Sequence, residues 1–181
     1  MTAKVLVLAG TAGTGKSSVA AILLRHYTED YPGLEFLEGD LLHPETNVVK
    51  MREGIPLQDN DRWDWLRQIS KQSSESAQKN GLCIVTCSSL KEKYRELIRT
   101  TSPETSFYFL FLYAEKAAIL QRLESREGHF MKANMMESQF RDLELPNCAE
   151  ESHCKILYVD GKSFEQVEEE VLKDVRELFS S

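Results

Sequence analysis

A short stretch near the N-terminus constrains the fold more than any other part of the sequence. Residues 5–8 form a four-residue apolar run, which predicts a strand buried on both faces. The run leads into GTAGTGKS at residues 10–17, which fits the pattern G-x-x-x-x-G-K-[ST]. Residues 18–27 then have helix-forming, amphipathic character. The order strand, loop, helix is the context that this pattern requires, so the sequence predicts a nucleotide-binding site here.

The residue types in this loop suit a bound phosphate. Glycines allow successive backbone N–H groups to approach an anion, and the following helix directs its positive end toward the same point. Lys16 is expected to reach the β- and γ-phosphates, and the Ser17 hydroxyl to take one Mg²⁺ position. The alternative is a glycine-rich turn that binds nothing. The expected nucleotide contacts are Gly10, Thr11, Ala12, Gly13, Thr14, Gly15, Lys16, Ser17 and Ser18.

Length and charge restrict the class of protein. A chain of 181 residues is most simply one domain, spanning 1–181, with a core large enough to need no metal or disulfide. Its formal net charge of −7 argues against nucleic acid or a membrane surface as partner, because both attract basic patches. An acidic chain that binds an anionic nucleotide must concentrate positive charge locally, which makes the positions of its arginines informative.

Cysteine spacing and the lack of long apolar runs indicate the cytosol. Cys83, Cys87, Cys148 and Cys154 do not have zinc-knuckle spacing, so buried, reduced thiols are expected. The first ten residues are too few for a signal peptide, and no apolar run approaches the length of a membrane span.

Apolar runs alternate with helical patterns along the chain, which predicts an α/β fold with a parallel sheet. The clearest helix follows Ser163, where Ser163-Phe-Glu-Gln166 resembles a capping box. The expected strands cover residues 5–8, 35–37, 82–86, 107–112 and 156–159. The expected helices cover residues 15–27, 45–52, 63–79, 91–99, 115–126 and 135–143.

Polar residues follow the second expected strand. Glu38 and Asp40 come at its end, and His43 lies three residues further on. Ligands of open α/β sheets bind outside the carboxyl ends of the strands. Two carboxylates at this point would hold Mg²⁺ and face a substrate hydroxyl. The alternative is a capping or solvated acidic turn.

Two further segments carry basic side chains. Arg52 precedes the helix-ending Gly54, and its guanidinium suits a carboxylate or phosphate. Asp59 or Asp61 would cap the next helix, which explains both aspartates without a ligand. The third strand ends before Ser88 and Ser89, and Lys91 and Arg95 follow. These polar groups again lie where ligands bind, although a plain helix cap by Ser88 or Ser89 is the alternative.

Arg122 and Arg126 are four residues apart, so they share one helix face, and Gly128 ends that helix. A mobile lid that carries two arginines suits phosphoryl transfer, because it brings positive charge to the transferring group and excludes water. The alternative is a solvated helix face.

Taken together, these segments resemble the gluconate kinases of the small P-loop sugar-acid kinase family, which is related in fold to shikimate and adenylate kinases. The resemblance covers nearly the whole chain. It rests on Gly10-x4-Gly15-Lys16-Ser17, Gly39-Asp40-x-x-His43-Pro44, Lys50-Met51-x-x-Gly54-x-Pro56-Leu57, Asp59-x-Asp61-Arg62-x-x-Trp65-Leu66, Cys87-Ser88-x-Leu90-Lys91-x-x-Tyr94-Arg95, Arg126-x-Gly128-His129-Phe130, Gln139-Phe140 and Leu143-Glu144-x-Pro146.

The resemblance implies transfer of the γ-phosphate of ATP, with Mg²⁺, to the terminal hydroxyl of D-gluconate. It also implies a three-layer α/β/α fold of the P-loop NTPase type, a five-stranded parallel sheet of order 2-3-1-4-5, a helical lid at about 122–146 and a homodimer. The implied catalytic residues are Lys16, Asp40, Arg122 and Arg126. The implied gluconate contacts are Asp40, His43, Arg52, Ser88, Lys91, Arg95, His129 and Gln139.

One departure and several rivals accompany the resemblance. The family often has Asp-Gly-Asp where this chain has Glu38-Gly39-Asp40, so the resemblance implies at most an outer-sphere Mg²⁺ role for Glu38. Another small-metabolite kinase, of the shikimate or nucleoside-monophosphate type, is the main rival. A GTPase switch is disfavoured because no N-K-x-D segment appears. A non-catalytic scaffold is disfavoured by the intact set of charged residues.

Overall fold

In the computed structural model, residues 2–124 and 133–181 are described. Five parallel strands form one sheet in the order β2-β3-β1-β4-β5. The strands are β1 (Lys4–Ala9), β2 (Glu35–Glu38), β3 (Leu82–Thr86), β4 (Ser106–Tyr113) and β5 (Cys154–Tyr158). This sheet order confirms the order that the resemblance implies.

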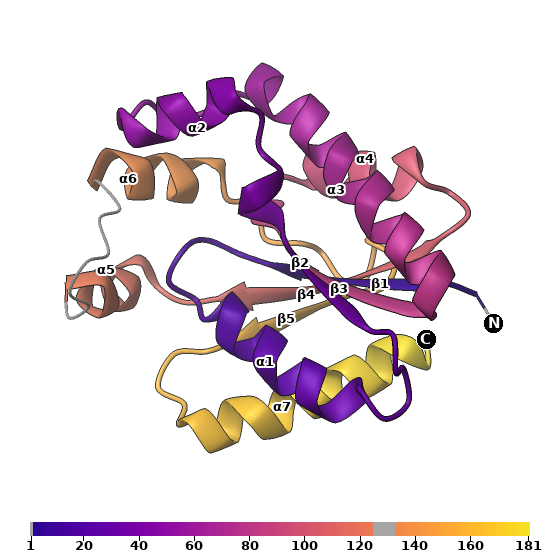
Figure 1. Cartoon of the computed structure of the whole chain (residues 1–181). Helices are drawn as coiled ribbons and strands as arrows, with labels where there is room; N and C mark the ends of the chain where they lie inside the picture. The colour runs from indigo at the N-terminus through magenta and orange to yellow at the C-terminus, as the bar shows by residue number, and fades with distance from the viewer. Residues whose placement is uncertain (1, 125–132) are drawn as a thin grey trace.

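Helices cover both faces of the sheet, and further helices lie at the carboxyl ends of the strands (Figure 1). The α-helices are α1 (Lys16–Tyr27), α2 (Glu45–Arg52), α3 (Asp59–Asn80), α4 (Glu92–Thr101), α5 (Lys116–Glu124), α6 (Ala133–Asp142) and α7 (Phe164–Phe179), and η1 (Gly39–Leu42) is a 3₁₀-helix. In Figure 1, α1 and α7 lie on one side of the sheet and α3 and α4 on the other. The helices α2, α5 and α6 gather at the end toward which the strands point (Figure 1).

The central strand β1 explains the two-sided core. Its residues Leu6 and Leu8 belong to the cluster that packs against α1 and α7, whereas Val5 and Val7 belong to the cluster under α3 and α4. All four side chains are fully buried. Successive strand residues point to opposite faces, so a continuous apolar run fills both layers. The expectation of a strand buried on both faces is confirmed.

Among the helix starts, that of α3 departs furthest from the sequence pattern. Helix α3 begins at Asp59, four residues before the expected start, because Gln58 and Asp61 form a capping box in which Asp61 Oδ2 accepts from Gln58 N at 2.8 Å. Helix α4 begins at Glu92 with Lys91 as its N-cap residue, so neither Ser88 nor Ser89 caps it.

The helix expected after Ser163 is confirmed. Gln166 N donates to Ser163 Oγ at 3.2 Å, and Ser163 N donates to Gln166 Oε1 at 2.8 Å. All four cysteines are free thiols within the described ranges, but Cys148 is exposed, so the expectation that all four are buried is wrong for that residue. Among the helices of these ranges, none has the length and apolar character that crossing a membrane requires.

Candidate active site

The strand ends meet at one edge and surround a cavity of about 500 Å³. The backbone N–H of Gly10, after β1, donates to the carbonyl of Ser88, after β3, at 3.1 Å, which joins these two strand ends directly. The structure brings seven of the expected site residues to this cavity. They are Ala12, Lys16, Asp40, His43, Arg52, Ser88 and Gln139.

The phosphate loop has the backbone that its glycines predict. Gly10 has a φ of 130°, and a Cβ there would lie 2.3 Å from the Leu112 carbonyl oxygen. Gly15 has a φ of 93° and directly precedes α1, so the helix N-terminus faces the loop. The Nζ of Lys16 donates to the carbonyls of Gly10 and Thr11 at 2.8 and 2.7 Å, which places the ammonium over the loop.

Lys16 and Asp40 are electrostatically coupled. Burial lowers the pKa of Lys16 to about 8, although the carboxylate of Asp40 acts in the opposite direction. Asp40 lies on η1, which is held tightly against the end of β3: a Cβ on Gly39 would lie 2.0 Å from the Thr86 carbonyl oxygen. Trp65 Nε1 donates to the Gly39 carbonyl at 2.8 Å. These contacts fix the turn that carries Asp40 on the cavity wall.

Of the two other polar residues expected after β2, His43 lines the cavity and Glu38 does not. Glu38 is exposed and does not line the cavity, whereas Asp40 does. His43 stacks on Trp65 with ring centroids 4.0 Å apart. Burial lowers the pKa of His43 to about 4, so the ring is neutral near pH 7.

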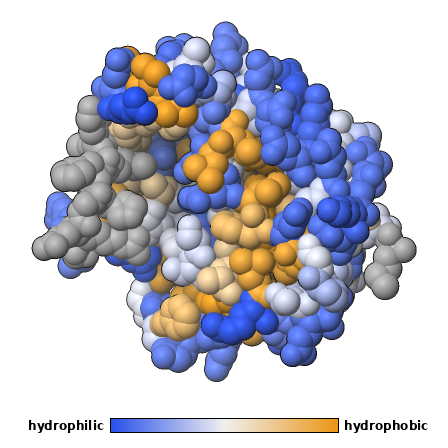
Figure 2. All heavy atoms as spheres, in the orientation of Figure 1, coloured by the Kyte–Doolittle hydropathy of each residue, from blue (hydrophilic) through white to orange (hydrophobic). Residues whose placement is uncertain are grey.

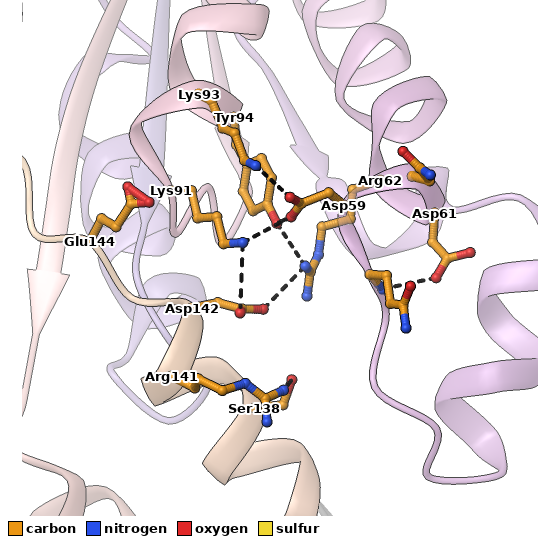
Figure 3. A network of polar contacts seen from close by, with 12 residues as sticks. Asp59, Asp61, Arg62, Lys91, Lys93, Tyr94, Ser138, Arg141, Asp142 and Glu144 are labelled. Atoms are coloured by element: carbon orange, nitrogen blue, oxygen red, sulfur yellow. Dashed lines mark hydrogen bonds and ion pairs between the residues drawn. The ribbon is translucent and has the colours of Figure 1, made fainter.

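Arg62 lines the cavity, although it was not among the expected site residues. Its Nη1 donates to Tyr94 Oη at 2.8 Å and to Asp142 Oδ2 at 3.2 Å, and the residue is 9% exposed. Figure 3 shows Arg62 between Tyr94 of α4 and Asp142 at the end of α6. The guanidinium is therefore held in one orientation by two other helices. The only sequence signal for this residue was its place in the motif Asp59-x-Asp61-Arg62.

Lys91 was expected to contact substrate, but the structure directs it elsewhere. Its Nζ lies 3.0 Å from Asp59 Oδ1 and 3.9 Å from Asp142 Oδ1 (Figure 3). Asp59 also accepts from Lys93 and Tyr94, and these hydrogen bonds hold the pKa of its carboxyl well below the ordinary range. Lys91 thus belongs to a network that joins α3, α4 and α6, and it does not line the central cavity.

Arg95 was also expected to contact the substrate, but it does not line the cavity either. Its side chain is 1% exposed, with Nη2 2.6 Å and Nε 2.9 Å from the two carboxylate oxygens of Glu151. Its Nη1 donates to the carbonyls of Ser89 and Leu90 at 2.8 and 3.1 Å. A guanidinium buried in this way holds the segment after β3 to the segment before β5. Arg95 therefore joins two segments of the fold, and it does not line the central cavity.

The expected lid residues lie on both sides of the phosphate loop. Gln139 of α6 accepts from the backbone N–H of Ala12 at 2.8 Å. Arg122 of α5 donates to the carbonyl of Gly13 at 3.3 Å. Arg126 and His129 lie outside the described residues, so their expected roles stay predictions.

A second cavity of about 380 Å³, which the sequence did not predict, lies beside the loop. It has an apolar wall that includes Val19, Ile22 and Phe164, and Lys162 and Arg122 supply cations at its border.

Known proteins now place this chain in a family. Residues 2–141 match the family model described as adenylylsulphate kinase. The chain is 57% identical over 175 residues to a protein of Saccharomyces cerevisiae named probable gluconokinase, covering 96% of this chain and 91% of that protein. The chain belongs to the gluconokinase family. The thermosensitive gluconokinase of Escherichia coli is 38% identical, and the match covers 86% of this chain and 80% of that enzyme.

Solved structures agree with membership of the gluconokinase family. A gluconokinase from Sinorhizobium meliloti superposes with a TM-score of 0.80 at 33% identity, over 99% of this chain and 95% of its own. A sugar kinase from Janibacter superposes with a TM-score of 0.82 at 36% identity, over 97% and 95%. The adenylylsulphate kinase CysC of Mycobacterium tuberculosis, at 21% identity and a TM-score of 0.68 over 99% and 98%, has the same P-loop kinase fold.

Proposed function

We propose that this chain transfers the γ-phosphoryl group of ATP to the terminal hydroxyl of D-gluconate, giving 6-phospho-D-gluconate and ADP. One observation carries the proposal: Lys16 of the phosphate loop, the carboxylate of Asp40 and the cation of Arg62 line a single cavity. A phosphate, an attacking hydroxyl and a carboxylate each find a complementary group there. Membership of the gluconokinase family favours this substrate over shikimate or a nucleoside monophosphate.

Asp40 and Lys16 have the roles closest to the chemistry. Phosphoryl transfer has a loose transition state, so catalysis depends on position and on compensation of charge. Asp40 orients the attacking hydroxyl and accepts its proton late, because an ionised carboxylate only accepts hydrogen bonds. Lys16 follows the negative charge of the transferring phosphoryl group. Arg122, which borders the loop, adds positive charge, and Arg126 has the same proposed role.

The sugar acid is recognised by hydrogen bonds from several elements. His43, Ser88 and Gln139 supply neutral polar groups, and Arg52 lies at the exposed side of the cavity. His129 stays a proposed contact. We assign the carboxylate of gluconate to Arg62, because its guanidinium is already oriented before substrate binds and a charge-assisted hydrogen bond is the strongest that this cavity offers. Sites of this kind reject analogues that lack the matched group.

The nucleotide base is proposed to enter the second cavity. The apolar side chains of Val19, Ile22 and Phe164 form a surface for a planar ring, and the cavity continues from the phosphate loop at Gly13 and Gly15. Arg122 lines it as well, so one residue would contact both base and phosphates.

The described residues fit Mg²⁺ in its usual form with nucleotides. Magnesium binds one or two protein oxygens and takes its remaining ligands from phosphates and water. Ser17 is exposed at the start of α1 and Asp40 lies on the cavity wall, which supplies oxygens of this kind. Within residues 2–124 and 133–181, no group of three or more His, Cys, Asp or Glu is placed to hold a metal alone. Bound Mg²⁺ would neutralise charge on the phosphates, and exposed Glu38 would act only through water.

The proposed partners of this chain are its two small-molecule substrates and a second copy of itself. Nucleic acid and membrane are not expected, while the homodimer and the cytosolic location stay predictions. In Figure 2, hydrophobic residues gather in a band across the face shown, and exposed large hydrophobic side chains of the chain include Leu41 and Phe164. Measurement of the molecular mass in solution would test the dimer.

ADP release with a panel of acceptors tests the proposed reaction. The panel contains D-gluconate, other sugar acids, D-glucose, shikimate, nucleoside monophosphates and adenylylsulphate. We expect turnover with D-gluconate to exceed that with every other compound, and the product to carry phosphate on the terminal carbon by ³¹P NMR. Greater turnover with adenylylsulphate or shikimate would contradict the proposal. The Lys16→Ala variant is the control for contaminating kinases.

A further inference from the structure

The side chains of Trp65 and Asn47 hold the imidazole of His43 from two directions. Trp65 covers one face, with the two ring planes 16° apart. On its edge, Nδ1 of His43 lies 3.1 Å from Nδ2 of Asn47. Since His43 also lines the cavity, the polar atom left for a bound molecule is Nε2.

The amide orientation of Asn47 is determined by a second contact. Asn47 is 2% exposed, and its Nδ2 lies 2.7 Å from the backbone carbonyl oxygen of Asp61. A carbonyl oxygen only accepts hydrogen bonds, so the Asn47 atom beside it must be the NH₂ group. One hydrogen of this group goes to Asp61 and the other to Nδ1 of His43. Nδ1 is therefore the acceptor, and the proton of the neutral ring lies on Nε2.

Asp61, whose carbonyl contacts Asn47, is itself held by hydrogen bonds. Asp61 lies in the first turn of α3, where its carboxylate accepts from Gln58 N at 2.8 Å and from Lys50 Nζ at 2.7 Å. The carbonyl that orients Asn47 thus belongs to the capping box of the longest helix of the described chain. A chain of hydrogen bonds runs from the backbone of α3 through Asn47 to the ring of His43.

We propose that Asn47 is a positioning residue for the sugar acid, because it fixes His43 as an Nε2–H donor toward the cavity. The proposal rests on the proposed function, in which this cavity holds gluconate. The charged groups that face the ring are Asp40 of η1 and Arg62 of α3. With Arg62 and the Nε2–H of His43, this part of the cavity presents donors, which suits the carboxylate or a hydroxyl oxygen of a sugar acid. Asp40 remains the acceptor at the reacting end.

A double-mutant cycle separates this role from a merely structural one. Asn47→Leu keeps the size of the side chain but removes the donor, so both neutral tautomers of His43 become populated. His43→Gln provides an amide N–H near the position of Nε2 and needs no tautomer partner. We expect Asn47→Leu to raise the KM for D-gluconate about 10-fold with His43 present and about twofold or less in the His43→Gln background. The KM for ATP should stay within about twofold in both.

Imidazole ¹⁵N NMR measures the tautomer directly. In the wild-type protein, His43 should show a protonated Nε2 and an unprotonated Nδ1, and the His43→Gln variant assigns the signals. In Asn47→Leu, a fraction with protonated Nδ1 should appear. Asn147→Leu is the matched control, since Asn147 is exposed and its side chain accepts from the nearby Ala149 N at 3.2 Å; its kinetics should equal those of the wild type.

Two results would overturn the proposal. One is a wild-type spectrum with the proton on Nδ1. The other is an equal rise of KM in the His43 and Gln backgrounds, which would assign Asn47 a structural role through α2 or Asp61. A wild-type protein without turnover of gluconate would instead refute the proposed function, while the NMR result would still decide the tautomer.

Discussion

Replacement of Arg62 by methionine tests how the site distinguishes a sugar acid from a neutral sugar. Methionine keeps much of the length of the side chain and removes the guanidinium. A hydrogen bond to a charged group contributes about 1.5–3 kcal/mol, so the KM for D-gluconate should rise about 10–100-fold. The KM for ATP should change little, because Arg62 lines the central cavity and not the second cavity, which is proposed to hold the nucleotide base.

The same substitution has a cost in stability that can be worked from the contacts of Asp142. Removing one partner of a buried ion pair costs about 3–5 kcal/mol. Asp142 is 13% exposed and keeps Lys91 at 3.9 Å, so we expect a smaller loss, about 1–3 kcal/mol in the free energy of unfolding. The double variant Arg62→Met with Asp142→Leu removes both charges and should recover much of this loss.

Steady-state kinetics with D-gluconate and with D-glucitol, which lacks the carboxylate, provide the assay. If Arg62 binds the carboxylate, the preference for gluconate over glucitol collapses in Arg62→Met and also in the stabilised double variant. A double variant that unfolds like the wild type and keeps that preference would refute the assignment. A rise in the KM for ATP alone would refute it as well.

Three further predictions concern Lys16 and Asp40. Lys16→Ala should fold normally and lower kcat at least ~100-fold, the loss typical of one such stabilising group, as a single-turnover assay will check. The pKa of Lys16 is about 8, below its ordinary 10.5, and bound phosphates favour its charged form; nucleotide binding at about pH 9 should therefore take up a proton, visible as a buffer-dependent enthalpy that Lys16→Met abolishes. Asp40→Asn should lower kcat by ~10²–10⁴-fold. Strong recovery of that variant at high Mg²⁺ would show that Asp40 chiefly holds the metal.

The first strand and the last helix could be predicted from sequence because their signals are local. An apolar run, a glycine pattern and the Ser163–Gln166 capping box each act within a few residues. The start of α3 was missed because Gln58 is not a usual N-cap residue, and the apolar pattern becomes regular only at Trp63. Helix boundaries depend on single side-chain contacts that periodicity does not reveal.

The basic residues show where sequence reasoning about the site stops. Lys91 and Arg95 follow a strand end, as ligand residues do, yet their partners are Asp59 and Glu151. Glu151 is 56 residues away from Arg95 in sequence, and no local pattern announces the pair. Arg62 reaches the cavity because α3 packs beside η1, which is a property of the fold. Residue type and spacing thus predicted which segments gather at the carboxyl ends of the strands, and tertiary packing decided which side chains line the cavity.

The hydrogen bond between Ala12 and Gln139 has a consequence for how two substrates share one enzyme. Ala12 N–H belongs to the loop that receives phosphate, and Gln139 lines the cavity assigned to the sugar acid. In the proposed reaction, a phosphate oxygen that accepts from the Ala12 N–H would release the Gln139 carboxamide, whose oxygen could then accept from a sugar hydroxyl. Thermodynamic linkage would make this effect mutual: gluconate would raise the affinity for nucleotide by the same factor as nucleotide raises the affinity for gluconate. Helix α6, which carries Gln139, would then couple the binding of the two substrates. The complex with both substrates would be favoured over the enzyme with only one of them bound.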